Sequence, residues 1–206
     1  MKLKTIASIF ALSLTMSAAS AANFSFTGNF TYDNTVQAFS FVVGAPSSVS
    51  LRSWSYAGGV NAAGQNIARG GFDPILALFD STGARVGEQD DAGCGLVAAD
   101  AVTGSCWDTF FTTNLAAGTY TATIQQYNNF SLGTLAQGFQ FDGVGNQNFR
   151  QGFMDANNDR RDSHWAFDIL NVNEATQNGR VPEPASLALL GLGLLGAAAA
   201  RRRKAA

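Results

Sequence analysis

Hydrophobic and polar residues alternate along much of the chain between residues 22 and 180. In the first such segment, Phe24, Phe26, Phe30 and Tyr32 are separated by Ser, Thr and Asn. Similar alternation recurs at residues 39–43 and 49–51. A period of two places one face of a strand in a core and the other face in water. Residues 74–79 are apolar throughout, which predicts a central strand that is covered on both faces.

The rest of this region also favours strands. Further strands are expected at residues 85–88, 107–113, 119–127, 139–141 and 165–170, with turn signals at 81–83, 117–118 and 178–179. No segment shows a helical stripe of more than two turns. About eight or nine short strands in residues 22–180 predict an all-β domain, a jelly-roll-like β-sandwich.

The N-terminus has the features of an export signal. Lys2 and Lys4 precede a short apolar run at residues 6–16, and Ala19-Ser20-Ala21 supplies a small-x-small cleavage pattern. The apolar run is too short to span a bilayer. Residues 1–21 are therefore predicted to form a signal helix that is cleaved after Ala21, and a retained anchor is the alternative.

The C-terminus combines a proline motif, an apolar stretch at residues 185–200 and a basic end. The motif residues are Val181, Pro182, Glu183 and Pro184, and the terminal cations are Arg201, Arg202, Arg203 and Lys204. Apolar residues followed by a cation cluster predict a hydrophobic helix whose end stays cytoplasmic, with the upstream body across the membrane. The two prolines prevent this helix from extending back into the body.

These three elements, in this order at the chain end, resemble the PEP-CTERM sorting signal of Gram-negative bacteria, which is also labelled an ice-binding-protein C-terminal motif. The resemblance covers residues 181–206. It implies transit through the inner membrane, cleavage near the Pro-Glu-Pro residues by an exosortase, and association with an extracellular exopolysaccharide. An uncleaved single-pass anchor is the alternative, because hydropathy alone agrees with it.

The body between these ends, residues 22–180, is acidic. It contains seven basic and fourteen acidic residues, a formal charge of −7 at pH 7, although the whole chain carries only −2. Such a charge disfavours nucleic acid and anionic lipid as partners, and it suits divalent cations or neutral polymers.

The body also resembles a known bacterial domain. The run from Phe72 to Gly83 leads to the acidic residues 88–91, and Asp108 and the segment 117–122 (AGTYTA) follow. This arrangement is similar to the bacterial pre-peptidase C-terminal domain, over roughly residues 24–127. The resemblance implies a jelly-roll-like sandwich that is non-catalytic, usually appended to secreted enzymes, and sometimes calcium-binding. Residues 128–161 depart from the pattern.

Cys94 and Cys106 are the two cysteines of the chain. A chain sent to an oxidising compartment is expected to join them in a disulfide, since disulfides form and persist there. Two thiols without a companion His or Cys would make a poor zinc site.

Acidic residues cluster twice. Asp73, Asp90 and Asp91 are predicted to converge if the strands at 74–79 and 85–88 form a hairpin, and this makes them candidate calcium ligands. The second cluster is the segment 155–162 (DANNDRRD), where oxygen side chains recur at alternate positions but Arg160 and Arg161 intervene. Ordinary turn formation is the alternative for both clusters, because Asp and Asn form local backbone hydrogen bonds.

Few residues suggest catalysis or ligand binding. The single histidine, His164, lacks a partnered nucleophile in sequence, and a strand-edge role with local hydrogen bonds is favoured. Four aromatic residues are candidates for stacking on sugars or for the core: Trp54, Tyr56, Trp107 and Tyr127. An ice-binding array would need regular threonines, and only Thr119, Thr121 and Thr123 offer one.

The function expected from these features is that of an exported, non-catalytic surface or matrix protein. The alternative is a carbohydrate- or ice-binding module, and a glycosidase that uses paired carboxylates is a remote third. The expected partners are the exosortase during processing and an exopolysaccharide afterwards, and calcium is the one cofactor considered.

Overall fold

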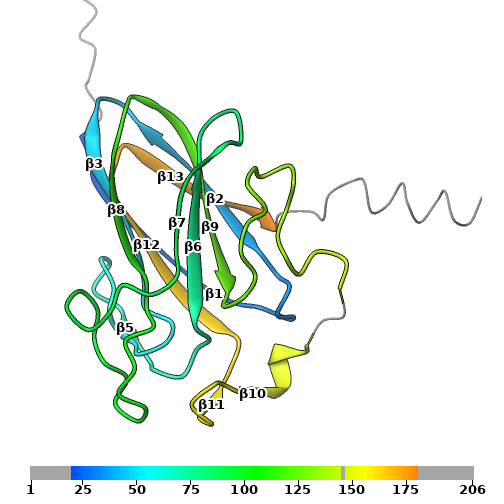
Figure 1. Cartoon of the computed structure of the whole chain (residues 1–206). Coiled ribbons are helices and arrows are strands. Elements are labelled where there is room, and N and C mark those ends of the chain that lie inside the picture. Colours follow the sequence, from blue (N-terminus) through cyan, green and yellow to red (C-terminus); the bar gives the residue numbers. More distant parts are fainter. Residues whose placement is uncertain (1–19, 145–146, 181–206) are drawn as a thin grey trace, which may run out of the picture.

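The computed structural model describes residues 20–144 and 147–180, and two antiparallel sheets dominate this part of the chain (Figure 1). The four-stranded sheet has the order β1 (Ala22–Asn29), β12 (His164–Val172), β3 (Ser47–Ser53) and β8 (Phe110–Leu115). The five-stranded sheet has the order β13 (Glu174–Arg180), β2 (Gln37–Val43), β9 (Gly118–Gln126), β6 (Pro74–Phe79) and β7 (Arg85–Gln89). The predicted all-β class is therefore confirmed.

Smaller elements connect these strands. The pairs β4 (Gly59–Val60) with β5 (Asn66–Ile67) and β10 (Phe153–Met154) with β11 (Arg160–Arg161) are short hairpins, and η1 (Phe149–Gln151) is one turn of 3-10 helix. Within the described residues, no helix has the length and hydropathy that crossing a bilayer requires. The predicted signal helix and C-terminal hydrophobic helix lie outside the described residues.

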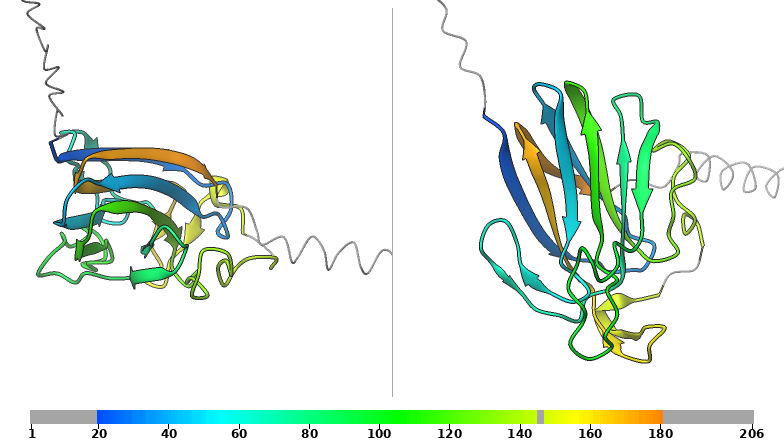
Figure 2. Two further views of the ribbon diagram at one scale, coloured as in Figure 1. Left: turned by 90° about the horizontal axis from the view of Figure 1, so that it is seen from above. Right: turned by 60° about the vertical axis from the view of Figure 1, so that its left-hand side comes forward.

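The two sheets pack face to face (Figure 2). Aromatic side chains make up much of the core between them. Phe39 of β2 contacts rings of the opposite sheet, with centroid distances of 4.9 Å to Phe167 and 4.8 Å to Phe26. Phe39, Phe41 and Phe167 are at most 1% exposed. Most of the residues whose alternation predicted strands therefore lie in the main core, as expected from two sheets that each bury one face. Tyr32 is the exception, since it is 39% exposed and lies beyond the end of β1 at Asn29.

Strand β6 is buried along its whole length, as the unbroken apolar run predicts. Leu76 and Leu78 face the main core, while Ala77 and Phe79 pack on the outer side with Val36 and Phe139. This second, smaller core lies between the five-stranded sheet and the segment 128–144, which bonds to the β6–β7 hairpin through backbone pairs such as Arg85 N–H to Gly133 O. Part of the region that departs from the family pattern therefore covers a sheet face.

The burial of one threonine rules out the threonine array that was considered for ice binding. Thr119 is exposed and Thr121 is half-buried, but Thr123 is fully buried beneath the segment 128–144. The three threonines do not present a continuous flat surface, which ice binding would need.

Some predicted element boundaries were wrong. Residues 139–141 lie in a turn region and do not form a strand. The Phe139 N–H donates to the Asp142 side chain, and only an isolated bridge joins Phe139 to Ser131. The expected strand at 107–113 begins only at Phe110. Asn178 and Gly179 lie inside β13, at a shift in its register with β2, and do not form a turn.

Several loops gather at one end of the sandwich, the lower end in Figure 1. They include the long connection between β7 and β8, in which Cys94 and Cys106 form the predicted disulfide with Cα atoms 5.0 Å apart. A closed loop of this size stabilises a fold by about 3 kcal/mol in the chain-entropy view. The disulfide restrains a connection that carries four aspartates: Asp90, Asp91, Asp100 and Asp108.

Candidate functional site

The three aspartates predicted as calcium ligands meet at this end of the sandwich. Asp73 directly precedes β6, and Asp90 and Asp91 directly follow β7, its antiparallel partner. One carboxylate oxygen of each lies within 4.8 Å of the other two. Asp73 and Asp90 are half-buried and Asp91 is exposed. The predicted convergence of these residues is therefore found.

Crowding and burial make these carboxylates hard to ionise. Burial raises the pKa of Asp73 to about 9, and the nearby carboxylates of Asp91, Asp90 and Asp108 add to the increase. Burial, followed by the charges of Asp91 and Glu88, raises the pKa of Asp90 to about 6. The pKa of Asp91 is raised by burial and then by Asp108. Loss of water and mutual repulsion both disfavour the charged forms.

Two oxygens of this cluster have no hydrogen-bond partner within the described residues. They are Oδ1 of Asp73 and Oδ1 of Asp90, and both are inaccessible to solvent. A buried polar atom normally finds a partner, because leaving it unpaired costs about 1–3 kcal/mol. The cluster therefore has an unmet requirement for a donor or a cation.

A fourth carboxylate stands behind the cluster. Asp108 is 2% exposed, and its two oxygens accept from Ser53 Oγ (2.8 Å), the Tyr56 N–H (3.1 Å) and the Ala57 N–H (2.8 Å). Burial raises the pKa of Asp108 although these hydrogen bonds oppose the increase. Since both oxygens already have donors, Asp108 serves as a fixed anchor for residues 53–57 instead of a free ligand.

The cluster borders a cavity of about 390 Å³. This volume lies within the range of small-molecule sites, about 300–1,000 Å³. The other side chains that line it include aromatic, amide and apolar groups: Trp107, Gln126, Tyr127, Phe153 and Met154. The sequence gives no sign of such a cavity, since Phe153 and Met154 belong to the region that departs from the family pattern.

The four aromatic residues considered for binding occupy different environments. Trp107 and Tyr127 line the cavity, and Tyr127 is 42% exposed. Tyr56 is fully buried, with its ring 4.9 Å from that of Trp107. Trp54 is half-buried and donates from Nε1 to Asp168, with the Arg52 guanidinium 3.9 Å from its ring. Only two of the four therefore remain candidates for ligand contact.

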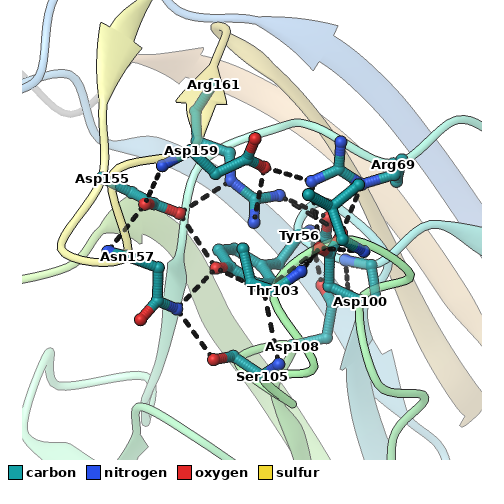
Figure 3. A network of polar contacts seen from close by, with 12 residues as sticks. Tyr56, Arg69, Asp100, Thr103, Ser105, Asp108, Asp155, Asn157, Asp159 and Arg161 are labelled. Atoms are coloured by element: carbon teal, nitrogen blue, oxygen red, sulfur yellow. Dashed lines mark hydrogen bonds and ion pairs between the residues drawn. The ribbon is translucent and has the colours of Figure 1, made fainter.

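Beside the cavity lies a buried ion network centred on Arg161 (Figure 3). The Arg161 side chain is 0% exposed, and its guanidinium stacks 3.5 Å from the centre of the Tyr56 ring. Its Nε donates to Asp155 (2.8 Å), and ion pairs of 3.3 and 3.5 Å join it to Asp159 and Asp100. One cation thus joins β11 to the disulfide-closed connection and to the segment after β3.

A second arginine completes the network. Arg69 donates to both oxygens of Asp100, at 2.5 and 2.9 Å, and also to Asp159. Burial opposes ionisation of Asp100, but the Arg69 hydrogen bonds prevail and hold its pKa well below the usual range. The pKa of Asp155 is also lowered, against the effect of its burial, by backbone N–H groups and by Arg161.

This network explains the second acidic cluster, residues 155–162. Asp155 Oδ1 accepts from the N–H groups of Asn157 and Asp159, which forms the turn between β10 and β11. Asp155 and Asp159 use their remaining capacity on the two arginines. Arg161 is therefore the partner of this cluster, and the segment has the turn role that was the alternative to calcium binding.

His164, another residue singled out in the sequence, does not line the cavity. His164 lies at the start of β12, where Nδ1 is 2.5 Å from Asp162 Oδ1, a local contact as predicted. Its Nε2 is 3.0 Å from the carbonyl oxygen of Ala68, which is 96 positions away in sequence, so its contacts are not all local. Strand β13 ends at Arg180, immediately before Val181. The motif and the cation cluster themselves lie outside the described residues.

A family model for the PEP-CTERM protein-sorting motif matches residues 180–204. The chain thus carries this motif in the place where its C-terminus resembles it. No curated protein matches the chain. Among solved structures, the chain is similar to the pre-peptidase C-terminal domain of a collagenase from Bacillus anthracis, with 9% sequence identity and a TM-score of 0.35. The similarity covers 75% of this chain and 90% of that one. That is the domain class which the body resembles, and so distant a similarity says nothing of ligands.

Replacing the buried Arg161 tests how much the ion network contributes to the stability of the fold. Arg161→Met is expected to lower the free energy of unfolding by about 3–5 kcal/mol, because Asp155 and Asp159 lose a buried counter-charge. Urea denaturation measures this. Arg160→Met is the matched control, since Arg160 is exposed and donates to the Gln151 carbonyl. Equal effects of the two substitutions would contradict the assignment.

Without metal, the protein should lose stability as pH rises. Asp73 binds its proton more tightly in the folded state (pKa about 9) than in the unfolded state (3.8), so this stabilisation is complete below pH 4 and declines toward pH 9. Asp90, with a pKa of about 6, adds to the slope at the acidic end. The slope for one proton approaches about 1.4 kcal/mol per pH unit.

Denaturant titrations of chelator-treated protein between pH 4 and 9 measure this slope, where the limits follow from the folded and unfolded pKa of Asp73. Asp73→Asn should flatten it. Glu174→Gln, an exposed carboxylate at the start of β13, is the control and should leave it unchanged. A slope that Asp73→Asn does not alter would show that this carboxyl is not the group responsible.

Proposed function

We propose that this chain is an exported, non-catalytic surface or extracellular-matrix protein, sorted by an exosortase, whose acidic cavity binds calcium. The observation that carries the sorting part is the PEP-CTERM match at residues 180–204, which begins at the last residue of the last strand. A folded body followed at once by a sorting motif suits delivery of an intact domain. The disulfide agrees with passage into an oxidising compartment.

The calcium part rests on the geometry of the three aspartates. Calcium prefers six to eight oxygen ligands and tolerates irregular geometry. Asp73, Asp90 and Asp91 can supply three to six oxygens, depending on whether each binds through one atom or two. The unpartnered Oδ1 atoms of Asp73 and Asp90 are available for a cation, and a divalent ion would remove the repulsion that raises their pKa values. The residues present therefore suit calcium.

A glycosidase is the competing function that the cavity brings back into consideration. Such enzymes place two carboxylates on either side of the scissile bond, one protonated and one ionised. Here three carboxylates share one cluster, which favours a bound cation over a flanking pair. The single histidine is occupied by Asp162 and Ala68 and does not line the cavity. These observations support the non-catalytic proposal.

The sorting proposal predicts the ends of the mature protein. Mass spectrometry of the protein recovered from the extracellular fraction should find an N-terminus near Ala22 and a C-terminus near Pro182 to Pro184. Replacing Glu183 and Pro184 together by alanine should trap the protein in the inner membrane. Recovery of the intact Arg201–Lys204 peptide from extracellular material would contradict sorting by cleavage.

The calcium proposal predicts a metal-dependent melting temperature. Millimolar calcium should raise the melting temperature of the exported protein and chelator should lower it, because an ion bound only to the folded state stabilises it by about 2.7 kcal/mol at one hundred times its dissociation constant. Magnesium should have a smaller effect, since it requires a tighter octahedral shell. Asp90→Asn should blunt the response and Glu174→Gln should not. A melting curve indifferent to calcium would refute this part.

A further inference from the structure

Two unlike kinds of side chain line the cavity: the carboxylates of Asp73, Asp90 and Asp91, and aromatic rings, chiefly Trp107 and Tyr127. Sugar rings present hydroxyl groups at their edges and apolar C–H groups on their faces, so the hydroxyls suit the carboxylates and the faces suit the aromatic rings. Metal binding alone would not require rings beside the carboxylates.

The coordination requirement of calcium also favours a ligand with hydroxyl groups in the cavity. Three aspartates leave part of a shell of six to eight oxygens unfilled unless all three bind through both atoms. Asp108 and Asp155 are near, but their oxygens already accept hydrogen bonds from protein groups. The open positions of a bound ion would therefore face the cavity, where water or ligand hydroxyls can complete the shell.

Protein contacts position the two aromatic residues. The Tyr127 backbone N–H donates to the Asp73 backbone carbonyl oxygen at 2.8 Å, which places the Tyr127 backbone beside the first aspartate. The Trp107 ring packs on Tyr56, and Tyr56 is clamped by Arg161 and by its own O–H bond to Asp155 (2.9 Å). The Trp107 ring is therefore held before binding and loses little conformational entropy when a ligand arrives, which favours affinity.

Charge restricts the class of ligand. The body carries a formal charge of −7 at pH 7, so polyanionic polymers would be repelled before contact. We infer that the cavity binds a neutral saccharide unit, whose face stacks on Tyr127 and Trp107 and whose hydroxyls complete the shell of a calcium ion held by Asp73, Asp90 and Asp91. This inference rests on the calcium part of the proposed function.

The test measures metal and sugar separately on the exported protein. Isothermal titration with calcium alone measures the metal site. Binding to an array of neutral oligosaccharides of glucose, galactose, mannose and N-acetylglucosamine, with and without chelator, measures the sugar site. We expect calcium-dependent binding to at least one neutral glycan, and retardation of the protein by dextran, if glucose is recognised, but not by dextran sulfate.

Variants connect this binding to the cavity. Tyr127→Ala should weaken glycan binding by about tenfold or more without changing the calcium titration, and Tyr127→Phe should restore it, because the ring provides the contact. Leu132→Ala is the matched control, since Leu132 is 51% exposed, lies five residues away in sequence and does not line the cavity.

The outcomes distinguish the two proposals. If calcium binds but no neutral glycan does, or if Tyr127→Ala binds glycans normally, the saccharide inference is wrong and the calcium site stands. If calcium does not bind, the calcium part of the proposed function fails, and glycan binding that persists in chelator would show recognition without the ion. Preference for dextran sulfate over dextran would also overturn the inference.

Discussion

The burial of one guanidinium constrains the whole loop-bearing end of this sandwich. A cation removed from water is tolerated only when anions and hydrogen-bond acceptors surround it. Arg161 obtains them from separate parts of the chain: the Tyr56 ring and carbonyl oxygen, Asp155 and Asp159 within its own hairpin, and Asp100 in the disulfide-closed connection. Satisfying this cation fixes the relative positions of these loops, and the cavity forms beside them.

Two sets of aspartates in this chain have pKa values shifted in opposite directions. Asp100 and Asp155 have arginine partners, so their pKa values fall despite burial. Asp73 and Asp90 receive no hydrogen bond from an arginine among the described residues, and their pKa values rise. Arginines within the chain satisfy the first group, whereas the second must remain protonated or acquire a cation from outside. This asymmetry, more than the number of acidic residues, makes the first group a structural network and the second a candidate for ligand binding.

Period-two alternation, as at Phe39 and Phe41, and the continuous apolar run at residues 74–79 were enough to predict these strands, because such side chains must be buried. The acidic cluster was also predictable, since Asp73 and Asp90 flank the two strands of one hairpin. Contacts distant in sequence were not predictable. The stacking of Arg161 on Tyr56 joins residues 105 positions apart. The packing of Phe139 on Phe79 depends on a turn at residues 139–141, where the aromatic pattern had predicted a strand. The adjacency of Arg161 to aspartates was the available signal, but it was interpreted as an obstacle to metal binding.

Among the described residues, the hydrophobic cores and the ion network lie upstream of the sorting motif in sequence. Every side chain of the two hydrophobic clusters, including those partly buried against them, lies between Phe24 and Ala175, and the ion network lies between Tyr56 and Arg161. The last strand, β13, adds only the partly buried Ala175 to the core before the sorting motif begins. Within the part of the chain that the structure describes, the packing of the body and the lining of its cavity thus rest on residues upstream of the motif. Cleavage near the motif, as proposed, would leave all of these described contacts in the released body.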